Sequence, residues 1–185
     1  MFQTQIREGV FLRLLEERHA LEVFRVVDRE RAYLREWLSW VDSTTAVEHT
    51  RDFIKISLEQ FAADEGLAAG IWCGDELAGT VGTHKINWPN RKVEIGYWIA
   101  SKFQGQGIAT SACRSLIDHA FQQWDLNRVE IHCATANKRS CSVAERLGFQ
   151  LEGTLREAQL VGARYLDLNV YGMLAREWKL RCHDS

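Results

Sequence analysis

The sequence predicts an α/β protein, more narrowly an α+β fold with a mixed sheet flanked by helices. Residues 67–100 contain three strand-like runs separated by short turns, which is typical of an antiparallel meander. A strongly periodic helical segment and a buried-type strand come next, at residues 107–124 and 128–134. Because strand, helix and strand follow an antiparallel meander, the sheet should be mixed and should carry helices on its faces.

The chain has the composition of one globular domain. It contains 185 residues, of which 46% are hydrophobic and 26% charged, and these values exclude a disordered, collagen-like or low-complexity protein. A chain of this length can bury roughly 70% of the surface that it exposes when unfolded, so it needs no metal or disulfide for stability. Pro89 is the only proline, and no linker-like stretch divides the sequence. We therefore expect a single domain spanning residues 1–185.

Charge and cysteine content exclude several classes of site. The 23 basic and 25 acidic residues give a net charge of −2, so the overall charge favours neither nucleic acid nor an anionic membrane, and any anion needs a local site. The five cysteines form no C-x-x-C pair, which argues against a disulfide framework or a metal site and fits reduced thiols in the cytoplasm. No stretch approaches 18 apolar residues, so we expect neither a signal peptide nor a membrane span.

The N-terminal part predicts one strand and two helical regions. Residues 10–15 resemble a short strand, and residues 19–38 show the apolar period of one or two helices. A further helix should begin near Thr45, which has the spacing of a capping box with Glu48, and should end at Gly66. The residues expected on its apolar face are Val47, Ile54, Leu58 and Phe61.

The elements after residue 66 are separated by clear turn signals. Three strands are expected at residues 67–73, 76–86 and 92–100. The helix that follows carries two adjacent apolar rows, formed by Ile108, Ala112, Leu116, Ala120 and Trp124 and by Ala109, Cys113, Ile117 and Phe121. The last expected elements are a strand at 128–134, a helix at 140–147 and strands at 149–158 and 168–175.

The stretch from Glu94 to Ala109 joins a strand to that helix through a glycine-rich turn. Gly105 and Gly107 lack a Cβ, so the backbone can turn tightly and approach a ligand. The first N–H groups of a helix have no partner within it and lie at the positive end of its dipole, where they bind phosphate oxygens. Neither the P-loop pattern nor the dinucleotide-binding G-x-G-x-x-G pattern is present. The turn therefore predicts a phosphate site, with a plain tight connection as the alternative.

A family resemblance favours the phosphate site. The pattern Q-x-x-G-x-A at residues 104–109, and N-x-x-S at 137–140 leading to LGF at 147–149, resemble the GNAT N-acetyltransferase superfamily. The phrases EIGYWI, FQGQGIAT, NRVEI and ERLGFQLEGTLREA are similar to the branch that includes bacterial ribosomal-protein serine and alanine N-acetyltransferases. The resemblance covers residues 10–178 and implies a GNAT-like fold with a splayed, mostly antiparallel central sheet.

The resemblance also implies acetyl-CoA as the cosubstrate and no metal. In the family, acetyl-CoA lies where the fourth and fifth strands separate, and its pantetheine arm pairs with a free strand edge. Tyr97, Trp98 and Ile99 match that edge, and Gly96 would allow a bulge that starts the separation. Asn137 would bind the pantetheine or order its loop, and the alternative is a plain turn-forming Asn. Ser140 would lie near the cofactor sulfur, and the pyrophosphate would lie on Gln104, Gly105, Gln106, Gly107, Ile108 and Ala109.

The expected catalytic residues are Ser140 and Glu94. Many family members protonate the departing thiolate with a tyrosine seven residues after the Asn, but that position is Ala144 here. Ser140, which as a preferred N-cap residue also has a structural explanation, or a water would stabilise the thiolate instead. Glu94 would be a base acting through water, or else a structural carboxylate. His84 and His132 are further proton carriers on neighbouring strands, although lone strand histidines are usually structural.

Acceptor-binding residues are expected in the first helical region and in the last turn. Trp37, Trp40 and Asp42 would form an aromatic and acidic wall suited to a cation such as a peptide N-terminus, unless the tryptophans belong to the core. Tyr165 and Asp167 lie in a turn where similar enzymes close the acceptor cleft, and the alternative is an ordinary hairpin.

Together, these features predict an acetyl-CoA-dependent N-acetyltransferase that transfers acetyl to a primary amine by direct attack. The expected acceptor is the N-terminal α-amine of a protein, such as a ribosomal protein. An α-amine, with a pKa of about 7.7 to 8.0, is neutral at pH 7 far more often than a lysine is. The alternatives are a small amine (polyamine, amino sugar or antibiotic) as acceptor, and a non-catalytic acyl-CoA-binding module. We expect a cytoplasmic protein, a homodimer as in similar enzymes, and no direct binding of nucleic acid or membrane.

Overall fold

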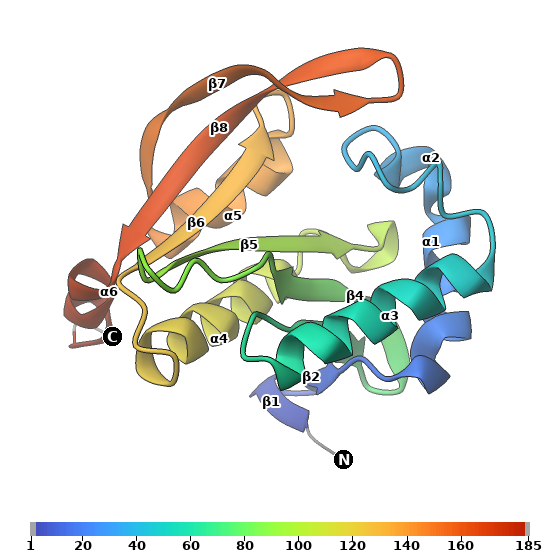
Figure 1. Ribbon diagram of the computed structural model, residues 1–185, viewed down its shortest axis with the longest axis horizontal. Helices are drawn as coiled ribbons and strands as arrows, with labels where there is room; N and C mark the ends of the chain where they lie inside the picture. The colour runs from blue at the N-terminus through green and yellow to red at the C-terminus, as the bar shows by residue number, and fades with distance from the viewer. Residues whose placement is uncertain (1–2, 184–185) are drawn as a thin grey trace.

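A central sheet of eight strands runs through the computed structural model, which describes residues 3–183 (Figure 1). The strands lie in the order β1-β2-β3-β4-β5-β6-β8-β7. Their bounds are β1 Gln3–Arg7, β2 Val10–Leu14, β3 Ala68–Cys73, β4 Glu76–Thr83, β5 Lys92–Ile99, β6 Arg128–Ala134, β7 Gln150–Val161 and β8 Arg164–Leu174. The predicted fold class, a mixed and mostly antiparallel sheet flanked by helices, is confirmed.

The sheet opens between β5 and β6. Neighbouring strands are antiparallel except β5 and β6, which are parallel and pair only from Lys92↔Arg128 to Glu94↔Glu130. Beyond Glu94, β5 stays paired with β4 up to Ile99, while β6 continues alongside β8. The two halves of the sheet therefore diverge, as Figure 1 shows, and the expected separation of the strands is present.

This opening does not start from a bulge at Gly96, so the bulge expected there is wrong. Gly96 pairs with Gly82, and the described pairs of β4 and β5 run without a register shift from Gly79↔Ile99 to Thr83↔Ile95. Because β4 and β5 stay in register, the opening comes from β6, which turns away together with β8 and β7.

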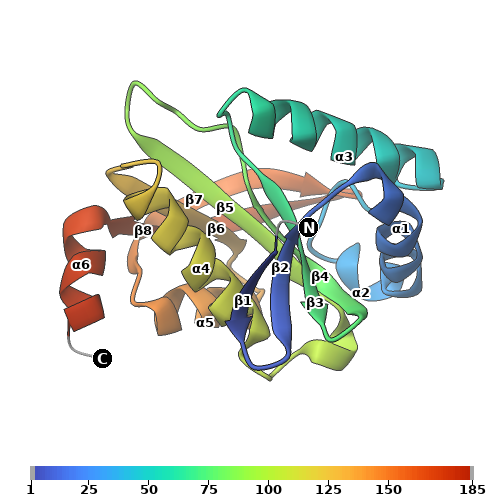
Figure 2. The same ribbon diagram turned by 90° about the horizontal axis from the view of Figure 1, so that it is seen from below.

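Helices cover both faces of the sheet (Figures 1 and 2). On one face α1 packs against α3, with α2 beside them; on the other lie α4 and α5, while α6 packs against β8. Their bounds are α1 Ala20–Arg29, α2 Arg31–Leu34, α3 Val47–Ala62, α4 Ile108–Gln122, α5 Lys138–Leu147 and α6 Ala175–His183. Short 3-10 turns at Glu17–His19 and Ser101–Phe103 precede α1 and α4.

The long helix α4 follows the sequence pattern closely. Gly107 precedes it with a φ of 74°, a left-handed conformation that favours glycine. The two predicted rows pack into the core, where the buried members are Ile108, Ala112, Cys113, Leu116, Ile117, Ala120 and Phe121. Burial of this wide apolar stripe fixes the start of the helix beside the end of β5.

The capping box predicted at the start of α3 is wrong. Ala46 is the N-cap, no side chain among the described residues caps the helix, and the Thr45 N–H donates to Nδ1 of His49 at 3.2 Å. Phe61, expected on or near the apolar face, is 44% exposed although it lies two helical turns after the buried Ile54, on the same face of α3.

Two terminal elements were not predicted. β1 is a short, mostly exposed strand that pairs with β2 across a turn at Gly9, whose φ is 69°. Its sequence QTQIR lacks the apolar alternation that indicates a strand. α6 follows β8 directly, with no turn residue to mark its start. Among residues 3–183, no helix is both long and apolar enough to cross a membrane.

Candidate active site

One cavity lies between the free edge of β5 and the starts of α4 and α5, and we call it the α4 cavity. Its volume is about 190 Å³. Within the described chain no strand pairs with this edge of β5 beyond Glu94, which leaves backbone groups beside Tyr97, Trp98 and Ile99 open to a ligand. The other predicted cofactor residues that line the cavity are Gln104, Gly105, Gly107, Ile108, Ala109, Asn137 and Ser140.

Gln106 is the one predicted cofactor residue that does not line the α4 cavity. Its side-chain amide donates to the Lys102 carbonyl at 3.0 Å. Its own carbonyl accepts from Nη1 of Arg7, in β1, at 2.7 Å. Gln106 therefore stabilises the glycine turn before α4 through contacts outside the α4 cavity.

The start of α4 has the features of an anion site. Gly105 and Gly107 have φ values of 73° and 74°. A Cβ on Gly105 would meet nothing within 4 Å, so backbone conformation rather than crowding requires glycine here. In this first turn, whose N–H groups have no partner within the helix, the buried Oγ1 of Thr110 also has no hydrogen-bond partner among the described residues. These donors fit the pyrophosphate of the expected cofactor.

Positive charge comes to this cavity from α5. Arg139 and Arg146 both line it, and their seven-residue spacing places them on one face of the helix. Arg139 Nη1 donates to Oε1 of Gln104 at 2.5 Å, and the Gln104 amide donates to the Ile99 carbonyl at 3.4 Å. Both arginines were missed in the sequence analysis, although their seven-residue spacing at a predicted helix can be read from the sequence. The α4 cavity thus combines backbone donors with two cations.

A second cavity, which we call the α3 cavity, lies between α3 and the opposite face of the sheet. Its volume is about 1010 Å³. The sheet contributes Glu94, Gly96 and His132, among others. α3 contributes His49, Asp52, Phe53, Ile56 and Gln60, a helical face that sequence reasoning missed. Phe53 and Ile56 are 48% and 54% exposed, so part of this wall is an open apolar surface.

Trp37 and Trp40 are the predicted acceptor residues that line the α3 cavity. Trp37 is half-buried and also lines the α4 cavity, whereas Trp40 is 39% exposed. Neither tryptophan belongs to the buried core.

The other three predicted acceptor residues line neither cavity. Asp42 forms a two-point ion pair with Arg35, with both N···O distances at 3.1 Å. Tyr165 is 63% exposed on the β7–β8 hairpin. Oδ1 of Asp167 accepts the Glu157 N–H at 2.8 Å and so supports the irregular part of β7. The hairpin alternative accounts for these last two residues.

The two cavities meet where β5 and β6 diverge. The residues that line both are Trp37, Leu38, Tyr97, Trp98, Asn137 and Ser140. At this junction the Tyr97 hydroxyl lies 3.0 Å from Oγ of Ser140 and donates to the Ser140 carbonyl at 3.0 Å. Burial raises the pKa of Tyr97 above its ordinary value, so the hydroxyl keeps its proton. Ligands in the two cavities would touch beside these two hydroxyls.

Asn137, and not Ser140, caps α5. Oδ1 of Asn137 accepts the Ser140 N–H at 3.2 Å, and Ser140 is the third residue of the helix. The expected N-cap role of Ser140 is therefore wrong, and its hydroxyl is directed to Tyr97. Asn137 thus stabilises the start of α5, and its contact with the pantetheine stays a prediction.

Glu94 lies at the last β5 position that pairs with β6, and it lines the α3 cavity. One of its carboxylate oxygens is 3.3 Å from Nδ1 of His132, and the other is 3.6 Å from Nε2 of His84. Both histidines line the same cavity. The fold thus brings the three expected proton carriers together. Within residues 3–183, no group of His, Cys, Asp and Glu side chains is arranged to hold a metal ion.

Comparison with known proteins gives relatives that match almost from end to end. YdaF of Bacillus subtilis (strain 168), to which a ribosomal N-acetyltransferase activity is provisionally assigned, is 37% identical over 180 residues, covering 97% of this chain and 98% of that protein. The ribosomal-protein-serine acetyltransferase of Escherichia coli (strain K12) is 31% identical over 170 residues, covering 92% and 95%.

Structural comparison and a family model agree with these relatives. RimL, a ribosomal L7/L12 alpha-N-protein acetyltransferase solved in complex with coenzyme A, has a TM-score of 0.91 at 28% identity, covering 95% of this chain and 99% of that chain. The family model described as an acetyltransferase (GNAT) domain matches residues 10–150. The resemblance found in the sequence is confirmed, and the chain belongs to the GNAT acetyltransferase family.

Proposed function

We propose that this protein transfers the acetyl group of acetyl-CoA to the N-terminal α-amine of a protein. The proposed acceptor class is a ribosomal protein. The E. coli relative is named for acetylating serine of ribosomal proteins, and RimL for acetylating the α-amine of L7/L12. The donor follows from the family and from the coenzyme A bound in RimL.

The junction of the two cavities carries this proposal. The α4 cavity offers the first N–H groups of α4, the Thr110 hydroxyl, which has no partner within residues 3–183, and two arginines to a pyrophosphate. Its free β5 edge offers backbone groups to the amides of a pantetheine arm. The α3 cavity is at the upper end of ligand-pocket volumes and opens to solvent beside Trp40 and Phe53, which suits the first residues of a peptide. A thioester and an amine would meet beside Tyr97 and Ser140.

In this mechanism the neutral amine attacks the thioester carbon, and the carbon–sulfur bond then breaks. Backbone N–H groups of the free β5 edge receive the oxyanion of the tetrahedral intermediate. Ser140 donates a hydrogen bond to the departing sulfur, in place of the family tyrosine that Ala144 replaces, and Tyr97 positions Ser140 by donating to its carbonyl. A thiolate with a pKa near 8.5 needs only this modest help. Glu94, on the acceptor side, accepts the proton that the amine loses.

An α-amine acceptor fits the chemistry of this site better than a lysine side chain. On the order of 10% of an α-amine is neutral at pH 7, against well under 0.1% of a lysine. A single carboxylate flanked by histidines, as at Glu94, is therefore sufficient base for an N-terminus.

We further propose a cytoplasmic homodimer that does not bind nucleic acid directly. β7 is the outer strand of the sheet, and its Leu151, Leu155 and Leu160 are each about half exposed, so a second copy would cover them. The cytoplasm is where new ribosomal proteins and acetyl-CoA meet. A net charge of −2 supplies little attraction to RNA phosphates. Light scattering after size exclusion tests the dimer, and a monomer mass would contradict it.

The acceptor is tested with synthetic peptides that begin with Ser or Ala and carry one internal lysine. Each peptide is supplied with its α-amine free or already acetylated, and spermidine is the small-amine comparison. We expect equimolar thiol release and N-terminal acetylation of the free peptides alone, measured by thiol titration and tandem mass spectrometry. Preferential reaction of spermidine would support a small-amine enzyme instead. Acetyl-CoA binding without thiol release for any acceptor would support a non-catalytic module.

A further inference from the structure

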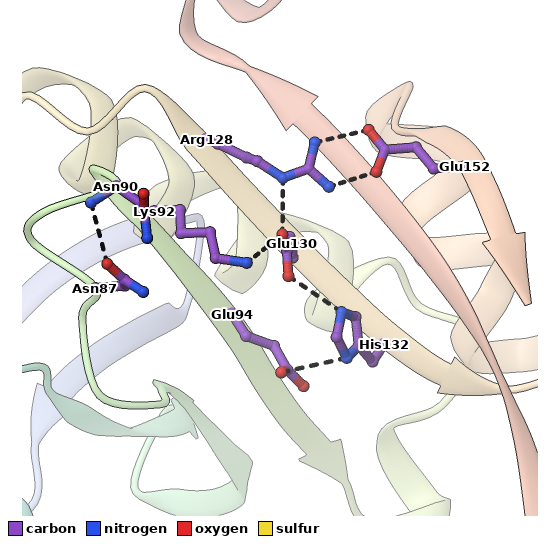
Figure 3. A network of polar contacts seen from close by, with 8 residues as sticks. All are labelled: Asn87, Asn90, Lys92, Glu94, Arg128, Glu130, His132 and Glu152. Atoms are coloured by element: carbon purple, nitrogen blue, oxygen red, sulfur yellow. Dashed lines mark hydrogen bonds and ion pairs between the residues drawn. The ribbon is translucent and has the colours of Figure 1, made fainter. Parts of the chain in front are cut away.

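Glu130 anchors a network of charged side chains on the acceptor side of the sheet (Figure 3). Glu130 is 9% exposed, and its Oε1 accepts from Nε of Arg128 at 2.7 Å and from Nζ of Lys92 at 3.1 Å. Arg128 also donates to both carboxylate oxygens of Glu152. Burial alone would raise the pKa of Glu130, but the hydrogen bonds from Arg128 and Lys92 outweigh it and hold the pKa below its ordinary value. Glu130 is therefore an anion at neutral pH.

The second oxygen of Glu130 determines which ring nitrogen of His132 carries the hydrogen. Oε2 of Glu130 lies 3.2 Å from Nε2 of His132. Because a carboxylate anion only accepts hydrogen bonds, Nε2 must carry a hydrogen. On the other side of the ring, Nδ1 lies 3.3 Å from Oε2 of Glu94. A neutral ring with its hydrogen on Nε2 has a lone pair at Nδ1, so Nδ1 and the Glu94 carboxylate are two neighbouring acceptors, between which one proton could be shared.

We propose that this shared position receives the proton of the acceptor ammonium, with Glu94 and His132 as a catalytic base pair and Glu130 as the residue that positions His132. When the shared proton is absent, Glu94 and Nδ1 of His132 present two adjacent acceptors to the α3 cavity. An ammonium N–H donates to them; its bond breaks, the proton binds Glu94 or Nδ1, and the electron pair stays on nitrogen for the attack. This inference rests on the proposed function.

His84 gives the proton a route to solvent. Its Nε2 lies 3.6 Å from Oε1 of Glu94, and its side chain is 68% exposed, against 19% for His132. Glu94 thus joins a half-buried imidazole to an exposed one, and transfer through His84 resets the pair after each turnover. The other ionisable side chains that line the cavity are His49, Asp52, Lys85, Tyr97 and Cys133. Among the described residues, no hydrogen bond or ion pair joins any of these five to Glu94 or His132.

The kinetic test compares Glu130→Gln with Glu152→Gln. Both variants remove one carboxylate partner of Arg128, but only Glu130 contacts His132. We expect Glu130→Gln to lower kcat about 10-fold with KM for peptide and acetyl-CoA unchanged, because positioning of the base is lost and binding is not. Glu152→Gln should leave kcat within about two-fold of the parent. His132→Gln, which removes half of the base pair, should lower kcat about 100-fold.

The spectroscopic test uses ¹⁵N-labelled histidine, whose ring nitrogen shifts report which nitrogen carries the hydrogen. Neutral His132 should be the Nε2–H tautomer in the parent and in Glu152→Gln, and should lose that preference in Glu130→Gln. This readout requires no acceptor. An Nδ1–H tautomer in the parent, an unchanged tautomer in Glu130→Gln, or equal losses of kcat in the two glutamine variants would overturn the inference. Failure of the parent to acetylate any N-terminal peptide would overturn the proposed function instead.

Discussion

At the scale of single residues, Tyr97 and Ser140 occupy the point on which transfer depends. Tyr97 donates to the backbone carbonyl of Ser140, so Ser140→Ala removes the serine hydroxyl and keeps that hydrogen bond. We expect Ser140→Ala and Tyr97→Phe each to lower kcat about 10-fold to 100-fold, since the first removes the donor to the departing sulfur and the second removes the hydrogen bond that positions Ser140. Thiol release at saturating substrates measures the effect.

Ser142→Ala is the matched control for this pair of variants. Ser142 lies on the same helix and lines the α4 cavity, but its hydroxyl donates to the Arg139 carbonyl at 2.9 Å and not to Tyr97. It should keep the parental kcat. If Ser140→Ala and Tyr97→Phe also turned over at the parental rate, neither hydroxyl would assist the sulfur.

At the scale of elements, the start of α4 depends on two glycines in the left-handed conformation. Gly105→Ala and Gly107→Ala each strain the turn before α4 by about 1 kcal/mol or more, because alanine disfavours the left-handed conformation. Because the turn would shift to relieve this strain, we expect acetyl-CoA affinity to fall about 10-fold in calorimetry. Gly153→Ala is the control, since an added Cβ there meets nothing within 4 Å and the residue lies in β7. Parental affinity in both Gly105→Ala and Gly107→Ala would refute the assignment of the start of α4 as the pyrophosphate site.

The elements predicted well from sequence are those specified by local patterns. The rows of α4 and the β3–β5 meander depend on side chains a few residues apart, and the structure contains both. The glycine turn before α4 was predictable for the same reason, because its left-handed glycines and the following helix start are consecutive in sequence. α3 shows the limit. Its capping pattern at Thr45 was local and still failed, because Ala46 occupies the cap and His49 binds the Thr45 N–H instead.

The acceptor side was harder to predict because only the tertiary fold assembles it. Tyr97 and Ser140 are separated by 43 positions and meet through the packing of α5 beside the free edge of β5. Phe53 and Ile56 line the α3 cavity although their helix face carried no motif. Asp42 and Tyr165 had suitable chemistry, but an ion pair with Arg35 and an exposed hairpin place them elsewhere. On the acceptor side, the chemistry of a side chain therefore predicted its role poorly, because its position in the fold was not known.

At the scale of the whole molecule, one buried carboxylate joins helices from opposite faces. Oε2 of Glu30, after α1, accepts the Ser101 N–H at 3.0 Å just ahead of α4, and Glu30 is 8% exposed. Burial alone would raise its pKa, but hydrogen bonds from Ser101 outweigh this and hold the pKa below its ordinary value. The stabilisation is thus complete above the unfolded pKa of about 4.3 and is lost as pH falls through the lower folded value.

Thermal unfolding of Glu30→Gln across a pH series tests this linkage. The variant should unfold at a lower temperature than the parent at neutral pH, because a neutral amide accepts the Ser101 N–H less strongly. The two unfolding temperatures should converge as the solution is acidified below about pH 4, where the parental carboxylate becomes protonated. A difference that stays constant down to acid pH would show that ionised Glu30 contributes nothing.

The same opening of the sheet creates both cavities, one on each face, and lets them meet only beside Tyr97, Ser140 and their neighbours. The central claim is that donor and acceptor occupy these cavities together. Calorimetry with a conjugate tests it most directly, using coenzyme A joined through an acetyl bridge to the α-amine of a peptide that begins with Ser. The account predicts binding about 100-fold tighter than coenzyme A alone, since one molecule fills both cavities. An affinity equal to that of coenzyme A would contradict it.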